Sequence, residues 1–85
     1  MPSKTVTVGS SVGLHARPAA VISEAAADLD SEVTLAVRGE EPVDASSSLL
    51  IMTLGASHGD EVEVAGEDQA AGDAIAALVE KDLDA

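Results

Sequence analysis

The spacing of the apolar residues changes along this chain of 85 residues, and that change limits the folds open to it. Residues 5–8, 32–38 and 61–64 alternate apolar and polar side chains, which is typical of strands with one buried face. Residues 16–29 and 68–83 repeat apolar side chains every three or four positions, which is typical of one-sided helices. The sequence therefore predicts an α+β fold in which helices cover one face of a sheet.

Two shorter elements complete the predicted order. Residues 40–43 are too short and too acidic for more than an edge strand, and Pro42 limits its pairing. Residues 49–52 form an apolar run that serines open and Gly55 closes, which favours a brief helix. The order is then strand, helix, strand, short strand, short helix, strand, helix. We expect one domain over residues 1–85, because no linker, repeat or low-complexity segment divides the sequence.

Composition narrows the class of protein. The chain has no cysteine and no aromatic residue, which excludes disulfides, thiolate metal sites and base stacking on single-stranded nucleic acid. Sixteen acidic residues against four Lys and Arg give a net charge of −12, which would repel nucleic acid. No apolar run approaches the ~20 residues of a membrane span, and residues 1–7 lack the apolar stretch of a signal peptide. We expect a cytoplasmic protein with no membrane insertion and no cofactor.

Residues 13–20, Gly-Leu-His-Ala-Arg-Pro-Ala-Ala, place an imidazole and a guanidinium where the first helix is predicted to begin. Proline is tolerated only in the first turn of a helix, so Pro18 indicates a start about two residues earlier. His15 then lies at or just before the N-cap, and the backbone N–H groups of Ala16 and Arg17 have no partner within the helix. These amides, the helix dipole and the guanidinium would all favour an anion carried on the imidazole.

The chemistry that these residues support is transfer of a phosphoryl group. One ring nitrogen of a neutral imidazole is unprotonated near neutral pH and can act as a nucleophile. Charge-assisted hydrogen bonds contribute roughly 1.5–3 kcal/mol each, and an exposed helix terminus adds about 0.3–1 kcal/mol. That is enough to hold a labile group without trapping it. On spacing alone, a capping or packing role for His15 and a solvated surface role for Arg17 remain the alternatives.

The HPr family, the histidine-containing phosphocarriers of the phosphoenolpyruvate:sugar phosphotransferase system, has an active-site signature that this segment resembles from Gly13 to Ala19. The resemblance covers nearly the whole chain and includes a second block from Ser46 to Gly55. It implies an open-faced sandwich of four antiparallel strands with three helices on one face, in the order βαββαβα. It also implies a phosphoryl-carrier protein that is a substrate of phosphotransferases and not itself an enzyme.

The resemblance also implies roles for individual residues. Phospho-enzyme I would phosphorylate Nδ1 of His15, which would pass the group to IIA domains of sugar permeases. The Arg17 side chain would balance the charge of the transferred group, and the backbone N–H groups of Ala16 and Arg17 would donate hydrogen bonds to it. Both partners would bind transiently to a monomer. Their shared surface around the histidine would comprise Ala20, Val21, Ser48, Leu49 and Met52.

Ser47 aligns with a regulatory serine that some HPr proteins carry at the start of the short helix, where a dedicated HPr kinase phosphorylates it. Serine at a helix start is first of all a capping residue. This sequence also departs from the regulated pattern, because Ser46 and Ser48 stand where regulated relatives have a basic and a large apolar residue. We therefore expect Ser47 to cap the helix, with phosphorylation as the alternative.

Two other functions stay open at this point. One is a regulatory module that contacts a transcriptional regulator or an enzyme through the serine face, although regulatory paralogues of the family lack the histidine that this chain has. The other is a phosphocarrier that serves a nitrogen-linked relay, which the sequence does not separate from sugar uptake. His58 is expected to be an exposed turn residue, and the chain shows no ligand spacing typical of a metal site.

Overall fold

A computed structural model describes residues 3–11, 13–29, 31–37 and 39–81. Its elements are β1 (Ser3–Thr7), α1 (Ala16–Ala27), β2 (Val33–Val37), β3 (Val43–Asp44), α2 (Ser48–Thr53), β4 (Glu61–Gly66) and α3 (Gln69–Glu80). The predicted order of elements is confirmed. Residues 82–83, which the sequence assigns to the last helix, lie outside the described residues, as does Arg38 of the second predicted strand.

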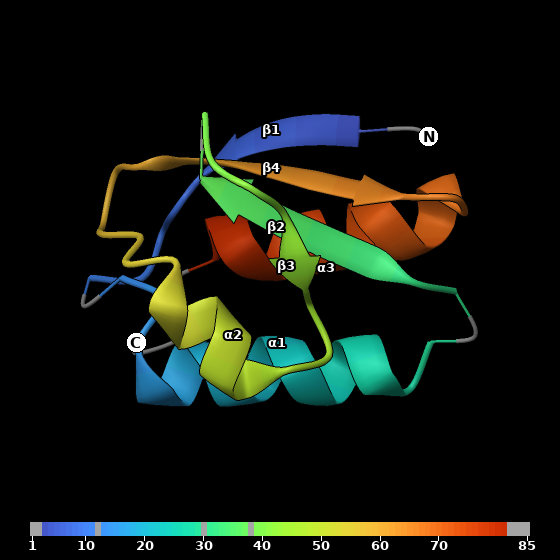
Figure 1. The fold of residues 1–85 in the computed structure, drawn as a ribbon, viewed down its shortest axis with the longest axis horizontal. Coiled ribbons are helices and arrows are strands. Elements are labelled where there is room, and N and C mark those ends of the chain that lie inside the picture. Colours follow the sequence, from blue (N-terminus) through green and yellow to red (C-terminus); the bar gives the residue numbers. More distant parts are fainter. Residues whose placement is uncertain (1–2, 12, 30, 38, 82–85) are drawn as a thin grey trace.

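The four strands form one antiparallel sheet in the order β1-β4-β2-β3. Strand β1 pairs along its length with β4, which pairs on its other side with β2. Figure 1 shows this sheet with α3 behind β4 and β2 in the view, and with α1 and α2 below it. Helix α3 packs mainly against β1 and β4. The first strand thus obtains its hydrogen bonds from a strand near the other end of the described chain.

The helices cover one face of the sheet with an aliphatic core. Strand β4 buries alternate side chains, as the sequence predicts, and Val6 is the buried residue of β1. Strand β2 departs from the alternation because Ala36 is also buried. The largest fully buried side chains include Val33, Leu35, Val62 and Val64 of the strands and Ile22, Ile51, Ile75 and Val79 of the helices. Burial of apolar surface stabilises the fold by roughly 25 cal/mol per Å². Because the chain has no aromatic residue, this stabilisation depends on close packing of small side chains.

The third strand begins later than the sequence predicts, and a proline explains why. The sequence predicts an edge strand over residues 40–43, whereas β3 is Val43–Asp44. Pro42 has no N–H to donate, so pairing with β2 begins only after it. The expected position of this strand at the edge of the sheet is confirmed.

Two other elements differ slightly from their predicted bounds. Strand β1 begins two residues earlier and ends one residue earlier than predicted, and α2 is one residue longer at each end.

Candidate functional site

His15 is the N-cap residue of α1, as Pro18 predicts. Its backbone is extended, with φ −91° and ψ −159°, and its carbonyl accepts the first helical hydrogen bond from the N–H of Ala19 at 2.8 Å. The His15 side chain makes no capping hydrogen bond and is exposed. The imidazole is therefore accessible to a reaction partner at the positive end of a helix.

The first turn of α1 offers backbone donors beside this imidazole. The N–H groups of Ala16 and Arg17 precede the first N–H that can bond within the helix, and Pro18 has no N–H. None of the described residues of this turn is acidic. An anionic group on His15 would therefore meet two donors with no carboxylate of the turn opposing it.

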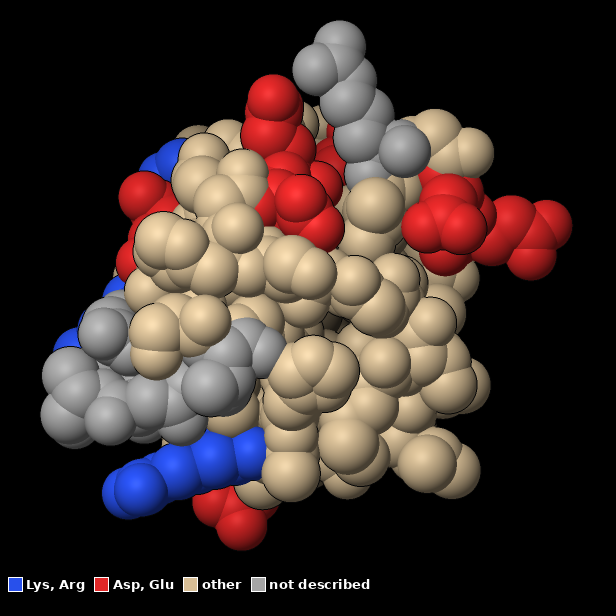
Figure 2. Space-filling model, turned by 90° about the vertical axis from the view of Figure 1, so that its left-hand side faces the viewer, with Lys and Arg blue, Asp and Glu red and all other residues tan. Residues whose placement is uncertain are grey.

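Arg17 is exposed and makes no ion pair with any described residue. Figure 2 views the side of the molecule where α1 begins and α2 ends, and the basic side chains visible in it lie along its left edge. A guanidinium without a structural partner keeps its donors available for an incoming phosphoryl oxygen. The structure thus exposes both His15 and Arg17, which lie two positions apart at the start of α1.

The loop between β1 and α1 is packed against the C-terminal end of α3. The N–H of Gly9 donates to the carbonyl of Val79 at 3.0 Å. Ser10 is fully buried, and its hydroxyl donates to the carbonyl of Lys81 at 3.4 Å. A Cβ atom on Gly9 would lie 1.8 Å from the carbonyl oxygen of Glu80, so only glycine fits without a shift of the backbone. These positioning contacts join residues far apart in the sequence, and no local pattern predicts them.

The other side of that loop meets the turn that follows α2. The N–H of Leu14 donates to the carbonyl of Ala56 at 3.0 Å, and the Leu14 side chain is buried. Gly13 has a φ of 75°, which favours glycine, and a Cβ atom there would lie 2.4 Å from the same Ala56 carbonyl oxygen. The glycine and leucine of the signature segment therefore set the direction in which the chain enters α1.

The serine block caps α2. The Ser47 hydroxyl accepts a hydrogen bond from the N–H of Leu50 at 3.3 Å, which confirms the capping prediction, while phosphorylation of Ser47 stays a prediction. The backbone N–H and the hydroxyl of Ser46 donate to Oδ1 of Asp44 at 2.9 and 2.7 Å. The backbone hydrogen bond first, and then the hydroxyl, lower the pKa of Asp44 from its ordinary 3.8, because both favour the carboxylate.

We expect Asp44→Asn to destabilise the fold slightly at pH 7, by less than about 1 kcal/mol, because the carboxylate is exposed and screened by solvent. A lowered folded pKa means that the carboxylate stabilises the fold above its unfolded pKa, and that this contribution is lost as the pH falls through the folded pKa. Urea unfolding of both proteins between about pH 7 and pH 3 measures the difference. The prediction is wrong if the difference in the free energy of unfolding between the two proteins is larger at pH 3 than at pH 7.

Contact between α1 and α2 brings the expected partner residues to one side of the molecule. Ala20 and Leu49 are exposed, whereas Val21, Ser48 and Met52 are half-buried. A further apolar side chain lies here that the sequence did not assign to this surface, that of Leu50. It is 41% exposed, and Leu49 is 69% exposed. The signal that could have found it is Ile51: a short helix that buries this side chain turns the two preceding leucines away from the core.

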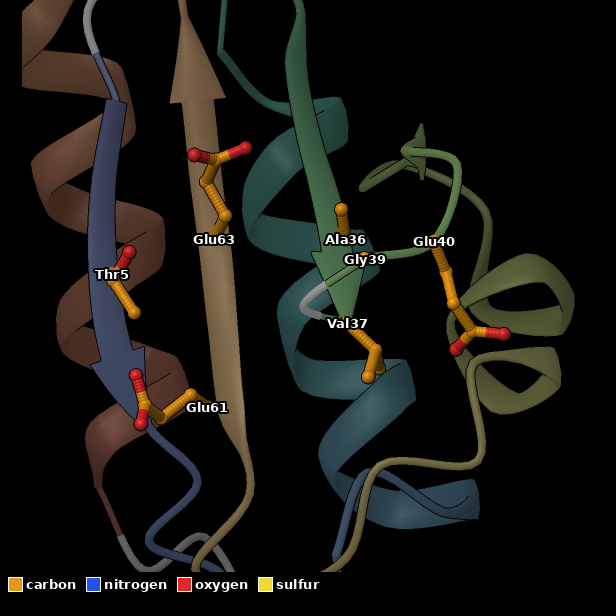
Figure 3. A pocket seen from close by; sticks show the side chains of 7 residues that line it. All are labelled: Thr5, Ala36, Val37, Gly39, Glu40, Glu61 and Glu63. Carbon is orange, nitrogen blue, oxygen red and sulfur yellow. The ribbon is translucent and has the colours of Figure 1, made fainter.

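The hollow on the open face of the sheet does not suit a phosphoryl group. Figure 3 shows a hollow on the open face of the sheet where Glu61 and Glu63 of β4 lie beside Thr5 of β1, and none of the described residues lining it is basic. His58 lies in an exposed turn, as predicted. Among the described residues, no group of three side chains could hold a metal ion. No described helix combines the length and the apolar character needed to cross a membrane.

Comparison with known proteins agrees with this geometry. Residues 2–81 match the family model described as PTS HPr component phosphorylation site. The chain is 38% identical over 78 residues to phosphocarrier protein HPr of Streptomyces coelicolor, covering 92% of this chain and 84% of the relative. It is 37% identical over 84 residues to phosphocarrier protein NPr of Shewanella violacea, covering 95% and 91%.

Solved structures confirm the expected architecture. A crystal structure of HPr from Bacillus anthracis matches with a TM-score of 0.84 and 31% identity, covering 92% of this chain and 95% of that chain. HPr-C-His from Thermoanaerobacter tengcongensis matches with a TM-score of 0.83 and 32% identity, covering 94% and 92%. With the exposed histidine at the start of α1 and the match along almost all of its sequence, the chain belongs to the HPr family of phosphocarrier proteins of the phosphotransferase system.

Proposed function

We propose that this protein accepts a phosphoryl group on Nδ1 of His15 from phospho-enzyme I and donates it to the IIA domain of a sugar permease. The observation that supports this most directly is the exposed imidazole at the N-cap of α1, beside two backbone donors and Arg17. Family membership supports the class of reaction. The proposed location is the cytoplasm, and the proposed active form is the monomer.

In the proposed transfer, an unprotonated imidazole nitrogen forms a bond to phosphorus while the bond between phosphorus and the donor atom of enzyme I breaks. Negative charge on the phosphoryl oxygens then faces the N–H groups of Ala16 and Arg17 and the guanidinium. Transfer to the IIA domain is the reverse process with a new acceptor. Positioning and electrostatic stabilisation supply most of the catalysis in such transfers, so a small carrier suffices.

Both partners are proposed to bind the surface around His15. Ala16 and Ala20 are exposed and small, so a partner can approach the imidazole closely along α1. Leu49 of α2 is the most exposed large apolar side chain in the described part of the chain, and it would add buried area to the contact. A modest, transient interface suits a carrier that must leave one partner to reach the next.

The direct test is incubation with phosphoenolpyruvate, Mg²⁺ and enzyme I, followed by mass measurement before and after mild acid. We expect the mass to rise by one phosphoryl group, the gain to be lost in acid, and fragment spectra to locate it on His15. Addition of a IIA domain should then remove it. IIA domains of a sugar permease and of a nitrogen-linked relay, compared side by side, identify the acceptor. Absence of any gain with active enzyme I contradicts the proposal.

Arg17→Glu should slow phosphoryl transfer to and from His15 roughly ten- to a hundredfold, because one charge-assisted hydrogen bond is lost and a repulsive charge is added. The fold should remain, since the Arg17 side chain is exposed. Lys4→Glu makes the same charge change on an exposed side chain of β1 and serves as the matched control. Rapid-quench kinetics measure both variants, and equal rates for the two would remove Arg17 from the mechanism.

A further inference from the structure

Two polar side chains are buried in the described part of the chain, those of Ser10 and Ser23. The Ser23 hydroxyl donates to the carbonyl of Ala20 at 3.1 Å, a local contact that serine commonly makes within a helix. The Ser10 hydroxyl instead donates to the carbonyl of Lys81, 71 positions away in the sequence. Burial of a hydroxyl removes its hydrogen bonds to water, so packing alone would favour an apolar side chain here. The contact that Ser10 makes across the fold therefore needs another explanation.

Ser10 belongs to a segment that caps the C-terminal end of α3. The N–H of Gly9 donates to the carbonyl of Val79 at 3.0 Å, and the Ser10 hydroxyl reaches the carbonyl of Lys81 at 3.4 Å. Carbonyl groups in the last turn of a helix have no partner within the helix, so donors from elsewhere stabilise them. In Figure 1 the chain that follows β1 descends past this end of α3 toward α1. The loop before the histidine is thus attached to the last helix at two successive residues.

The path from Ser10 to His15 is short and is braced at both ends. Ser10 lies five positions before His15, and its carbonyl accepts a hydrogen bond from the N–H of Gly13 at 3.0 Å, which closes a turn. The next residue, Leu14, is buried and donates its N–H to the carbonyl of Ala56. A shift of Ser10 therefore displaces the turn that leads the chain into α1. A misplacement of about 1 Å at a reacting group can slow a reaction by roughly a hundredfold.

Burial separates the effect of Ser10 on the reaction from any effect on partner binding. The Ser10 side chain has 0% exposure, so a partner docked on this protein cannot touch it. The residues proposed to meet a partner, such as Ala20 and Leu49, lie on α1 and α2 and make no printed hydrogen bond to Ser10. Loss of the Ser10 hydroxyl should therefore change the rate of the chemical step more than the affinity for a partner.

We infer that Ser10 is a positioning residue for phosphoryl transfer. By holding the loop to the end of α3, its hydroxyl keeps the His15 imidazole in the orientation from which Nδ1 attacks phosphorus. This inference rests on the phosphocarrier function proposed above and makes the end of α3 part of the support of the site. It predicts a slower transfer at unchanged affinity when the hydroxyl is removed.

The test is rapid-quench measurement with phospho-enzyme I over a range of concentrations of this protein, which gives kcat and KM for transfer. Ser10→Ala should lower kcat roughly three- to tenfold and leave KM within about twofold. Ser23→Ala is the matched control, because it also deletes a buried hydroxyl that donates to a backbone carbonyl. Both of its constants should stay within about twofold of the native values. Circular dichroism checks that each variant is folded.

A second variant and a second partner separate positioning from other roles. Ser10→Cys keeps a side chain of similar size with a weaker donor, so its kcat should lie between those of the native and the alanine proteins. Donation of the phosphoryl group to a IIA domain should slow by the same factor as its acceptance from enzyme I. Both steps use the same imidazole, whereas a contact with one partner would affect one step alone.

Several results would overturn the inference. A kcat of Ser10→Ala within about twofold of the native value, or an equal loss in Ser23→Ala, would show that the Ser10 hydroxyl does not position the histidine. A rise in KM at unchanged kcat would assign Ser10 to partner binding, and a Ser10→Cys protein slower than Ser10→Ala would assign it to packing. Failure of the phosphocarrier function itself differs from all of these, because enzyme I would then not phosphorylate the native protein at any concentration.

Discussion

Replacing His15 with alanine is expected to abolish phosphorylation of this protein by enzyme I, because the substitution removes the proposed nucleophile. The chain contains one other histidine, His58, which lies in an exposed turn after α2. His58→Ala is therefore a matched control that deletes the same side chain elsewhere. It should accept and donate the phosphoryl group at the native rate, as measured by the acid-labile mass gain and by rapid-quench kinetics.

The comparison is informative because the His15 side chain has no capping role. It is exposed and makes no capping hydrogen bond, so alanine should change the free energy of unfolding by no more than about 0.5 kcal/mol. Loss of labelling in a folded His15→Ala protein then reports on chemistry alone. Labelling that persists in this variant, or that disappears in His58→Ala, would rule out His15 as the carrier.

The largest effect on stability is expected from Gly9→Ala. The new methyl group would lie 1.8 Å from the Glu80 carbonyl oxygen and 2.6 Å from its carbonyl carbon. Both are backbone atoms, so no side-chain rotation relieves the overlap, and the loop must separate from α3. We expect a loss of roughly 3 kcal/mol or more in the free energy of unfolding, measured by urea denaturation followed by circular dichroism.

Gly72→Ala makes the same chemical change within α3 and is its matched control. A Cβ atom there meets nothing within 4 Å, and alanine is the better helix former, so a gain of up to about 1 kcal/mol is expected. Opposite signs for the two substitutions would show that the effect at Gly9 comes from the close contact with Glu80. A Gly9→Ala protein as stable as the native one would mean that the loop and the end of α3 are not held together.

Local signals in the sequence predicted much of the fold. Pro18 located the start of α1. An aspartate just before the apolar repeat of the last helix is typical of an N-cap, and the Asp68 carboxylate accepts a hydrogen bond from the N–H of Ala70 at 3.0 Å. The alternating strands buried the predicted faces. Such features depend on neighbouring residues alone, so one sequence is enough to predict them.

Other features depend on residues that only the fold brings together. Ala36 is 6% exposed although the alternation of its strand turns it outward; it is small and stands opposite Glu63 of the neighbouring strand. At the site, the position of His15 was predictable, whereas the attachment of Ser10 to the end of α3 was not. The exposure of Leu50 likewise depends on which side of α2 faces the core.

The contacts that hold the loop before His15 also order the events of folding. A ribosome completes β1 and α1 long before it completes the turn at Ala56 or residues 79–81, which hold that loop in the finished protein. Pairing of β1 with β4 must wait as well, and contacts between distant segments form slowly. We therefore expect a nascent chain to display the histidine without a formed site. Competence for phosphoryl transfer should appear only once α3 has packed.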